Sequence, residues 1–323
     1  MSRYLVIGGN GVIGHFVTRQ LVGQGHRPVV MSRRADPVLI CDIVDRCDLV
    51  AGDITDAAGV EKLVGAYDIT HIVHMGALLP SAAERDPALG VRINIEGAAN
   101  ILAAAVKHKV ARVILASSKG AYGPPQGRHR HPEYLPVPED TRARPFSVYG
   151  IAKIASEQLG TWYMKNHGLQ VASLRFATTV GPGKISRHGG HYSQLSVILE
   201  SAMAGKPFSI ESGGDPISDT IFNDDAARGI LAALQAPSLK HDLYNIGTGS
   251  GISTRDYADA CKRLFPGADI SIGGGLDVSG SQTFVMDVAR AKEDFGFVAD
   301  PSPDHIVRGY VETMKLLGLK PEV

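Results

Sequence analysis

The sequence predicts an α/β fold in which helices cover both faces of a doubly wound parallel sheet, followed by a smaller C-terminal lobe. In the first half of the chain, short and continuously apolar runs alternate with helical patterns. Such runs are typical of parallel strands that are buried on both faces. After Gly181 the expected strands become shorter, and the segment GADISIGGGLDVSGSQ is rich in glycine and serine. This change in the alternation of strands and helices predicts that the smaller lobe begins here.

The expected elements follow one another in strand–helix units. Strands are predicted at residues 4–7, 28–31, 49–50, 71–74, 112–116 and 171–176. Helices are predicted between them at residues 11–24, 57–64, 93–107 and 149–166. Four more helices are predicted in the second half, at residues 192–203, 224–234, 254–264 and 305–317. The segment DLYNIGTG, which begins at Asp242, is compatible with one further strand of the main sheet.

The composition is that of an ordinary globular protein and argues against several classes of function. Of the 323 residues, 44% are hydrophobic and 20% are charged, and the formal net charge is zero. Without a sustained basic face, nucleic acids and anionic membranes are poor partners. Apolar runs such as ILAAAV are too short to span a bilayer, and the N-terminus lacks a signal-peptide pattern. Cys41, Cys47 and Cys261 form no CxxC pair, which indicates reduced thiols and a cytoplasmic protein.

Three glycines, Gly8, Gly11 and Gly14, separate the first apolar run from the first helical pattern. Three at fixed spacing indicate that something approaches the backbone closely, because glycine otherwise costs conformational entropy. The N–H groups at a helix N-terminus are unsatisfied donors with partial positive charge, and a pyrophosphate satisfies them. The spacing is GxxGxxG rather than GxGxxG, and in the first strand–helix unit it predicts a dinucleotide site. The alternative is a tight turn between strand and helix.

A second pattern, the YxxxK of Tyr149 and Lys153, places two side chains one helical turn apart. A tyrosine with its usual pKa near ~10 is a poor base at neutral pH. A nearby ammonium favours the phenolate and lowers that pKa. The phenol then exchanges a proton with a substrate hydroxyl or carbonyl while hydride moves to or from a nicotinamide. The alternative is an ordinary pair on a helix surface.

The motifs together resemble the extended short-chain dehydrogenase/reductase family, also called the NAD-dependent epimerase/dehydratase family. The resemblance covers nearly the whole chain and rests on the order and spacing of GGNGVIG, GDITD, HMGA, NIEGAANIL, ASSKGAYG, YGIAK and RFATTVGPG. It implies a Rossmann-type fold with a smaller C-terminal substrate-binding lobe. We therefore expect residues 1–178 to form the dinucleotide-binding domain, with 219–247 returning to it. Residues 179–218 and 248–323 are expected to form the substrate lobe.

The resemblance also implies which residues contact the cofactor. The first motif is expected to bind the pyrophosphate, and Asp53 and Ile54 are expected to contact the adenine. Asn94 is included because relatives carry an asparagine near the active site at that place; its alternative role is helix packing. The expected cofactor-binding residues are Gly8, Gly11, Val12, Ile13, Gly14, Ser32, Arg33, Asp53, Ile54, Met75, Gly76, Ala77, Asn94, Lys153 and Ala177.

The residue that ends the second predicted strand distinguishes NAD from NADP. An acidic side chain there binds the ribose hydroxyls, whereas an arginine accommodates the 2′-phosphate. Ser32 stands at that place, Arg33 and Arg34 follow, and the next acid is Asp36. A hydroxyl and two guanidinium groups suit a phosphate, unless both arginines are simply solvated. We therefore favour NADP(H), with NAD(H) as the alternative.

The resemblance assigns a third catalytic group beside Tyr149 and Lys153. In the family pattern the active hydroxyl lies four residues before the tyrosine of a Tyr-Gly pair, and counting back from Tyr122 selects Ser118. Ser117 is the fallback, with backbone capping as its more ordinary role. Lys153 is also expected to bond the nicotinamide ribose. The predicted catalytic residues are therefore Ser118, Tyr149 and Lys153.

The expected substrate contacts depart from the family pattern. Relatives that act on sugar nucleotides carry an asparagine and an arginine that hold the substrate diphosphate, and this chain has Thr178 and Ser218 at those places. Lys184, Arg187 and His188 are candidates to compensate, unless they belong to a solvated loop. The expected substrate-binding residues are Ser118, Tyr149, Thr178, Lys184 and Arg187.

Dehydratase chemistry is disfavoured by the residues that follow Ser118. A dehydratase of the family needs an acid pair directly after its hydroxyl residue, and Lys119 and Gly120 occupy those places. No carboxylate is therefore available at this position to remove a proton from the substrate.

Three functions remain open. The first is an NAD(P)-dependent oxidoreductase that moves hydride between a nicotinamide and a hydroxyl or carbonyl carbon of a small or sugar-like substrate. The second is a sugar-nucleotide 4-epimerase that retains NAD and oxidises and re-reduces one carbon. The third is a non-catalytic dinucleotide sensor. The complete set of Ser118, Tyr149 and Lys153 argues against the sensor, which has no need of a proton relay.

The sequence also bears on metals and subunits. His129, His131, His188 and His191 lack the spacing of metal ligands, so no metal is expected. In the family, the helices that contain Asn94 and Tyr149 form a four-helix dimer interface. The resemblance therefore implies a homodimer through these two helices.

Overall fold

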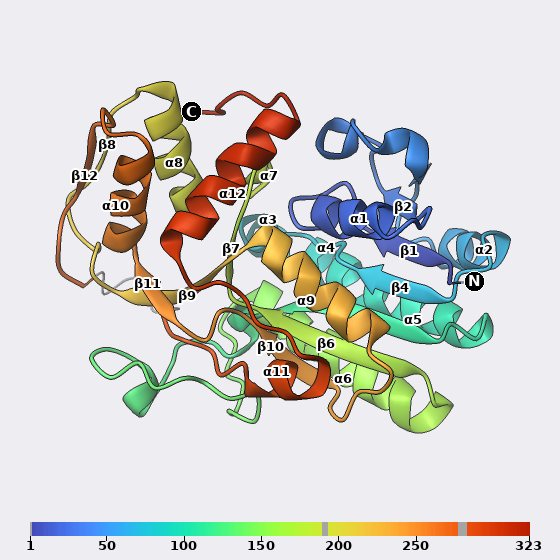
Figure 1. Ribbon diagram of the computed structural model, residues 1–323. Helices are drawn as coiled ribbons and strands as arrows, with labels where there is room; N and C mark the ends of the chain where they lie inside the picture. The colour runs from blue at the N-terminus through green and yellow to red at the C-terminus, as the bar shows by residue number, and fades with distance from the viewer. Residues whose placement is uncertain (1, 189–192, 277–282) are drawn as a thin grey trace.

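A seven-stranded parallel sheet lies at the centre of the computed structural model, which describes residues 2–188, 193–276 and 283–323 (Figure 1). The strands lie in the order β10-β6-β5-β4-β1-β2-β3, and every neighbouring pair is parallel. Their bounds are β1 Tyr4–Ile7, β2 Val29–Ser32, β3 Asp48–Ala51, β4 His71–His74, β5 Arg112–Ser118, β6 Gln170–Phe176 and β10 Leu243–Ile246. The order reverses beside β1, as in doubly wound folds. The predicted fold class is confirmed.

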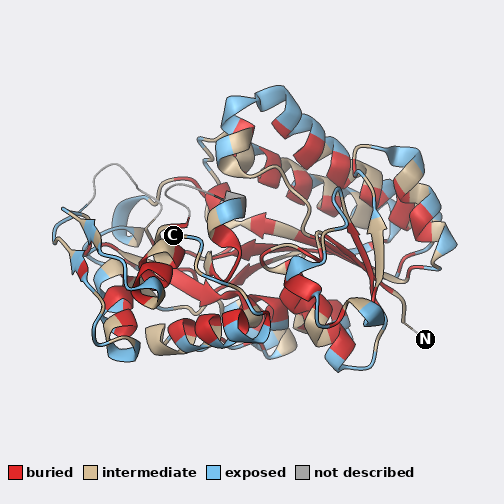
Figure 2. Ribbon diagram, turned by 90° about the horizontal axis from the view of Figure 1, so that it is seen from above, coloured by how far each residue is buried: buried red, intermediate tan, exposed pale blue. Residues whose placement is uncertain are grey.

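Helices cover both faces of this sheet because its strands are apolar on both sides. The main ones are α1 (Gly14–Gly23) and α9 (Asn223–Gln235) on one face, and α2 (Ala57–Ala66), α5 (Gly97–Lys107) and α6 (Val148–His167) on the other (Figure 1). Along β1, Tyr4 and Val6 belong to one hydrophobic core, whereas Leu5 and Ile7 belong to the other. Successive residues of a strand point to opposite faces. Continuous apolar runs therefore build two cores at once, and the strands of the large sheet are mostly buried (Figure 2).

The smaller part of the molecule lies at one end of the large sheet (Figure 1). It contains a three-stranded sheet in the order β11-β9-β7 and a two-stranded sheet of β12 and β8. The strands are β7 Thr178–Val180, β8 Phe208–Ile210, β9 Ile217–Phe222, β11 Gly251–Ser253 and β12 Ile270–Ile272. The helices of this part are α7 Lys184–His188, α8 Gln194–Ala204, α10 Thr254–Leu264 and α12 Pro303–Leu316.

Short elements connect these units. The short helices are α3 Pro80–Arg85, α4 Pro87–Val91 and α11 Ala289–Phe295, together with a single π-helical turn, η3 Arg92–Glu96. The 3₁₀ turns are η1 Val38–Ile40, η2 Val44–Arg46, η4 Lys119–Ala121 and η5 Gly127–His129.

Several predicted boundaries differ from the observed ones for local reasons. Helix α1 begins at Gly14 rather than at Gly11, because the N–H of Gly11 bonds the carbonyl of Gly8 at 2.9 Å and closes a separate turn. The helix predicted at 93–107 is regular only from Gly97, after the π-helical turn. The segment DLYNIGTG supplies β10, which pairs with β6 at the edge of the large sheet. Strand β9 instead belongs to the three-stranded sheet.

One apolar stretch is longer than expected. Residues Pro87–Lys107 are long and apolar enough to cross a membrane by length and composition alone, although Arg92 and Glu96 interrupt the apolar sequence. In the fold these residues form α4, η3 and α5, and α5 packs against α2 and α6. A core helix of a globular protein meets the same criterion.

Candidate active site

The candidate site lies where the central strands of the large sheet end. Strands β1, β4 and β5 end at Ile7, His74 and Ser118, and in parallel sheets these carboxyl ends share one edge. Each of the three strands is followed directly by a segment that the sequence assigns to the cofactor or to catalysis.

The glycine turn follows β1. Gly8 has φ +78°, which glycine adopts without strain. A Cβ at Gly11 would lie 2.9 Å from the carbonyl oxygen of Gly8, and one at Gly14 would lie 2.8 Å from Cα of Gly9. The turn therefore has room for glycine alone at these positions.

The N-terminus of α1 suits an anion. In the described structure no side chain caps this end, and no acidic residue lies in its first turn. The N–H groups of His15 and Phe16 already bond the carbonyls of Gly11 and Ile13. The partial positive charge of this helix end, and the N–H groups between Gly11 and His15, are what suit a pyrophosphate. Val12 and Ile13 precede this helix, and the carbonyl of Val12 accepts a hydrogen bond from Nδ2 of Asn223 at 3.0 Å. The residues present therefore fit a dinucleotide.

Asn10 joins the glycine turn to the loop after β2, a role that the sequence did not reveal. Its Nδ2 donates to the carbonyl oxygens of Arg34 at 3.0 Å and Asp36 at 2.8 Å, and the residue is only 4% exposed. A buried asparagine among glycines and apolar residues is the signal that sequence reasoning could have used. The contact holds the Ser32–Arg34 segment beside the turn.

The loop after β2 carries the predicted determinants of cofactor type. Arg33 and Arg34 are exposed. The Ser32 hydroxyl donates to the carbonyl of Arg34 at 2.6 Å. The O–H group of Ser32 is therefore engaged within the loop, and the two guanidinium groups remain the exposed donors.

Asp53 and Ile54 follow β3. The N–H and hydroxyl of Thr55 each donate to Asp53 Oδ1 at 2.9 Å. These bonds lower the pKa of Asp53, and the charge of Arg33 lowers it further. The Arg33 charge therefore acts on the carboxylate expected at the adenine. Ile54 is buried, and a Cβ at Gly97 would lie 2.6 Å from its Cδ1.

The loop after β4 lies against the glycine turn. A Cβ at Gly8 would lie 3.3 Å from the amide nitrogen of Gly76. Met75 continues the strand, because its N–H bonds the carbonyl of Ile7 at 2.9 Å. Met75, Gly76 and Ala77 are thereby placed beside Gly8.

Asn94 clamps this loop from the π-helical turn. Its Oδ1 accepts the Leu78 N–H at 2.6 Å, and its Nδ2 donates to the Leu78 carbonyl at 2.9 Å. Its own carbonyl accepts the Ser156 hydroxyl at 2.9 Å. The structure thus gives Asn94 a positioning role for the loop of Met75–Ala77.

The two serines at the end of β5 have different surroundings. Ser117 is buried and its hydroxyl donates to Glu157, which also pairs with Arg175 at 2.7 Å. Ser118 Oγ accepts the Gly120 N–H at 3.0 Å, so its own O–H is left to donate. The fallback Ser117 therefore belongs to a buried network, and Ser118 retains a hydroxyl suited to a substrate oxygen.

Tyr149 and Lys153 lie on α6, which packs against β5 and the turn that follows it. Ser147 caps this helix by accepting the Gly150 N–H at 3.0 Å. A Cβ at Gly150 would lie 2.6 Å from the carbonyl oxygen of Gly120. The absence of a side chain at Gly150 therefore lets the first turn of α6 approach the turn after β5 closely.

Lys153 is buried and its charge stands beside the Tyr149 ring. Its Nζ lies 5.1 Å from the ring centroid and donates to the carbonyl of Ala116 at 2.6 Å. Burial lowers the pKa of Lys153 to about 8, although the nearby Glu157 carboxylate opposes the change. Burial, helped by the Lys153 charge, lowers the pKa of His74 to about 3. His74 is therefore neutral, and Lys153 supplies the positive charge next to the phenol.

The substrate candidates meet around Ser218 of β9. Its Oγ lies 3.3 Å from Thr178 Oγ1 and accepts a hydrogen bond from Lys119 Nζ at 2.6 Å. Lys184 is buried, and its Nζ donates to the carbonyl of Thr179. In the sequence, Lys119 was notable only because it stands where a dehydratase has an acid. Its contact with Ser218 was not predicted.

The remaining candidates are Ala177, Arg187 and the histidines. Ala177 is buried, and its N–H bonds the carbonyl of Ile246 at 2.9 Å, which joins β6 to β10. Arg187 lies in α7, but its side chain falls outside the described residues, as does all of His191. Within the described ranges, no group of three or more His, Cys, Asp or Glu side chains could hold a metal ion.

This arrangement can bind a dinucleotide and move a proton. The glycine turn, Asn10 and the loops after β2 and β4 form a cradle beside an open helix N-terminus. Lys153 holds charge next to a phenol, and Ser118 offers a hydroxyl on the neighbouring strand. Such a combination is typical of hydride transfer coupled to a proton relay.

Comparisons with known proteins point to one family. The model of the NAD dependent epimerase/dehydratase family matches residues 4–247. The UDP-glucose 4-epimerase of Lactobacillus helveticus is 27% identical, over 95% of this chain and 91% of that protein. The mitochondrial L-threonine 3-dehydrogenase of Bos taurus is 28% identical, over 78% of this chain and 66% of that protein.

A solved structure shows the same fold. The UDP-glucose 4-epimerase of Thermus thermophilus, in complex with NAD, superimposes with a TM-score of 0.79. It is 24% identical, and the match covers 96% of this chain and 99% of that one. The similarity extends over both parts of the molecule.

Proposed function

Because the chain belongs to the NAD dependent epimerase/dehydratase family, we propose that it is an oxidoreductase with a Ser-Tyr-Lys relay. It moves hydride between a nicotinamide and a hydroxyl or carbonyl carbon of a small or sugar-like substrate. The observation that carries the proposal is the buried Lys153 ammonium, 5.1 Å from the centre of the Tyr149 ring. A bound nicotinamide supplies hydride acceptance or donation at the substrate carbon.

The protein's own groups then handle the proton. Tyr149 exchanges a proton with the substrate oxygen, and the adjacent Lys153 charge favours its phenolate form. Ser118, whose Oγ accepts the Gly120 N–H, donates its O–H to the same oxygen. Lys153 has three donors and uses one on Ala116, which leaves donors for the nicotinamide ribose.

The two parts of the chain divide the work in this proposal. Residues 1–178, with 219–247, bind the dinucleotide, and residues 179–218 and 248–323 bind the substrate. The proposal is supported by Lys184 and Ser218, which come from the second part and lie beside Thr178 and Lys119.

Turnover of Tyr149→Phe tests the relay. We expect the rate to fall by ~10²–10⁴-fold, because only proton transfer is lost, while the Kd for reduced cofactor stays unchanged. Tyr163→Phe, on the same helix, is the matched control and should keep full activity. Near-normal turnover of Tyr149→Phe would remove Tyr149 from the mechanism.

For the cofactor we favour NADP(H). The preference rests on the exposed Arg33 and Arg34 and on the lack of an acid at Ser32, although a solved relative is named as a complex with NAD. We expect Arg33→Ala to weaken NADPH about tenfold or more and NADH little, because only the 2′-phosphate loses a charged donor. Fluorescence titrations of both reduced cofactors measure this, with the exposed Arg46→Ala as control. Equal weakening of both would assign the site to NAD(H).

A 4-epimerase is the second candidate. It is favoured by the UDP-glucose 4-epimerase that matches 95% of this chain. Against it stand the short hydroxyls of Thr178 and Ser218, which offer no positive charge to a diphosphate. Absorbance of the reduced nicotinamide separates the two candidates: an oxidoreductase changes it with each turnover, whereas an epimerase interconverts UDP-glucose and UDP-galactose without net change.

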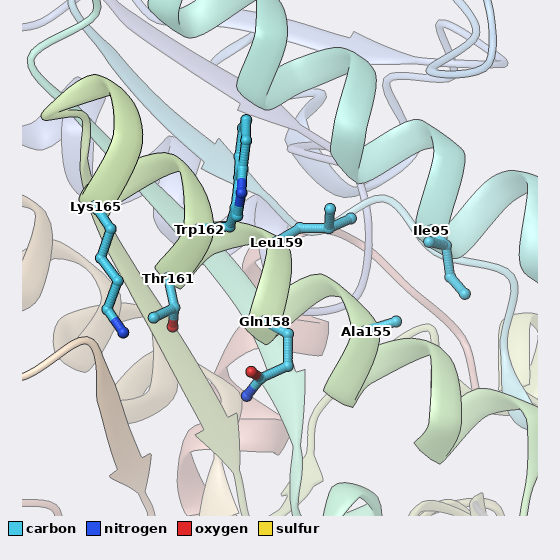
Figure 3. Close-up of a pocket in the computed structure, with 7 residues that line it drawn as sticks. All are labelled: Ile95, Ala155, Gln158, Leu159, Thr161, Trp162 and Lys165. Carbon is cyan, nitrogen blue, oxygen red and sulfur yellow. The ribbon is translucent and has the colours of Figure 1, made fainter.

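The protein is also proposed to form a homodimer through α6 and the helix that contains Asn94. A groove of about 570 Å³ follows the outer face of α6. It is lined by Ile95, Ala155, Gln158, Leu159, Thr161, Trp162 and Lys165 (Figure 3). Trp162 is 51% exposed there, and a large exposed aromatic side chain suits an interface.

We place the enzyme in the cytoplasm. Cys41, Cys47 and Cys261 are free thiols. Burial raises the pKa of Cys47 to about 11 and that of Cys261 to about 12. Both groups are therefore protonated and poorly reactive, which supports a structural role in a reducing compartment.

A further inference from the structure

Two buried lysines, Lys119 and Lys184, take no part in the proposed relay. Lys119 directly follows Ser118 and is 8% exposed; Lys184, the first residue of α7, is 6% exposed. Lysine is almost never this deeply buried without a partner of opposite charge. Both side chains therefore need an explanation.

Their contacts within the protein are few. Lys119 Nζ donates to Ser218 Oγ at 2.6 Å and lies 5.1 Å from the centroid of the Phe284 ring. Lys184 Nζ donates to the Thr179 carbonyl. Among the described residues, neither ammonium has a carboxylate within ion-pair distance. An ammonium has three donors, so each group has donor capacity left over.

The nearby charges do not balance. Asp219 is the carboxylate that acts on Lys119, and it is fully buried. Its oxygens are already held by the N–H and hydroxyl of Thr248, and by the N–H groups of Gly249 and Met286. Asp219 is thus fixed in its place, and of the two lysines it acts on Lys119.

The two lysines also act on one another. Burial lowers the pKa of Lys119 to about 8 and that of Lys184 to about 8, and the Lys119 charge contributes to the shift at Lys184. The groups are therefore close enough to repel. A negative ligand group between them would relieve both the burial and the repulsion.

We propose that Lys119 and Lys184 bind a carboxylate of the substrate, and that the substrate is a small hydroxy acid or oxo acid. Asp219 is the carboxylate that acts on Lys119, and burial raises the pKa of Asp219. A monoanionic ligand therefore supplies negative charge that the two ammonium groups lack. Because Lys119 is the chain neighbour of Ser118, the carboxylate stands close to the reacting oxygen. Ser218 and Thr178 orient Lys119 rather than holding a diphosphate. This inference rests on the proposed function and names its substrate class.

The test begins with binding, so that it does not depend on finding the true substrate. The complex of the enzyme with reduced cofactor is titrated with lactate and 3-hydroxybutyrate, and with the primary amide of each, by isothermal calorimetry. We expect each acid to bind at least about tenfold more tightly than its neutral amide, because charged hydrogen bonds are lost in the amide. Acids that bind no better than their amides would overturn the proposal.

Variants assign the effect to the two lysines. Lys119→Met should abolish the preference for the acid, and Lys184→Met, on a separate element, should weaken it at least about tenfold. The exposed Lys315→Met is the matched control and should change nothing. A preference that survives in both buried variants would contradict the proposal, even if one of them folds poorly.

Two further arms separate alternative outcomes. Glycerol 3-phosphate that binds more tightly than either acid would overturn the choice of a carboxylate. Interconversion of UDP-glucose and UDP-galactose by Lys119→Met at the wild-type rate would show that the substrate is a nucleotide sugar. A wild-type protein that does not bind a reduced nicotinamide cofactor would instead refute the proposed function. Cofactor binding is measured in a separate titration before the acids are added.

Discussion

At the scale of single residues, the site is built around three buried lysines that form no ion pair among the described residues. Lys153, Lys119 and Lys184 all have pKa values lowered to about 8 by burial. Groups of this kind cluster at functional sites because a poised proton or an open charge serves chemistry. Within the described part of the chain, each lysine makes one hydrogen bond, to Ala116, Ser218 and Thr179 respectively. Their remaining donors are what ligands would occupy.

His74 gives a prediction for the dependence of stability on pH. Its pKa is about 3 in the folded protein and ~6.5 in an unfolded chain. Between these values the unfolded state binds more protons, so stability is present above the unfolded pKa and falls as the pH decreases. From about pH 7 to about pH 5 this group removes roughly 2 kcal/mol from the free energy of unfolding.

Urea unfolding of wild type and His74→Gln at both pH values measures this loss. The variant should lose about 2 kcal/mol less than wild type over the same interval. The exposed His167→Gln is the control and should follow the wild type. Parallel curves for wild type and His74→Gln would show that His74 is not held neutral.

Some residue roles were within reach of the sequence and others were not. Tyr149, Lys153 and Ser118 could be proposed because their spacing along the chain is short and characteristic. The contacts of Asn10 lie 24 and 26 residues away, and that of Lys119 lies 99 residues away. No local pattern encodes such distances. Ser117 and Ser118 are adjacent in the sequence, and only their hydrogen-bond partners, Glu157 and Gly120, distinguish their roles.

At the scale of elements, the glycine turn and α1 act as one unit. The turn closes because Gly14 lets the helix approach Gly8 and Gly9. Gly23 ends the same helix, and a Cβ there would meet nothing within 4 Å. We therefore expect alanine substitutions at Gly14 and Gly23 to have opposite effects on stability.

We expect Gly14→Ala to destabilise the protein by more than about 1 kcal/mol, because backbone must move. It should also weaken cofactor binding, since the open N–H groups move with the helix. Gly23→Ala should instead stabilise by about 0.4–1 kcal/mol and leave the cofactor Kd unchanged. Chemical unfolding and cofactor titration measure both. A neutral Gly14→Ala would mean that the turn is looser than described.

Element prediction succeeded where burial on two faces imposes a pattern. The strands of the large sheet are apolar and continuous, and the helix at Thr254–Leu264 has the predicted bounds. The three-stranded sheet was missed because β7 and β11 have three residues each and the apolar pattern of β9 is interrupted by Ser218, Asp219 and Thr220. Such short strands form through partners that are distant in sequence. The π-helical turn at Arg92–Glu96 was also missed, because one extra residue per turn leaves the apolar pattern nearly unchanged.

At the scale of the whole molecule, the face of α6 around Trp162 is the expected subunit interface. Trp162 contacts Tyr163 edge-on, with ring centroids 5.1 Å apart, and remains 51% exposed. Phe146 and Ile151, near the start of the same helix, are also more than half exposed. Exposed apolar side chains gathered along one helix favour association.

Trp162→Glu should convert the protein to a monomer, because a buried, unpaired charge strongly disfavours the interface. Analytical ultracentrifugation measures the change. Leu316→Glu, at an apolar position on α12 that is also more than half exposed, is the control and should leave the dimer intact. A wild type that sediments as a monomer would remove the interface proposal.

The whole account depends on where a bound cofactor lies. A crystal structure with reduced cofactor tests this most directly. The account predicts the pyrophosphate against the N–H groups that follow Gly11, and the nicotinamide within reach of the Tyr149 hydroxyl, Ser118 and Lys153. A pyrophosphate bound away from the glycine turn, or a nicotinamide ring out of reach of the Tyr149 hydroxyl, would contradict it.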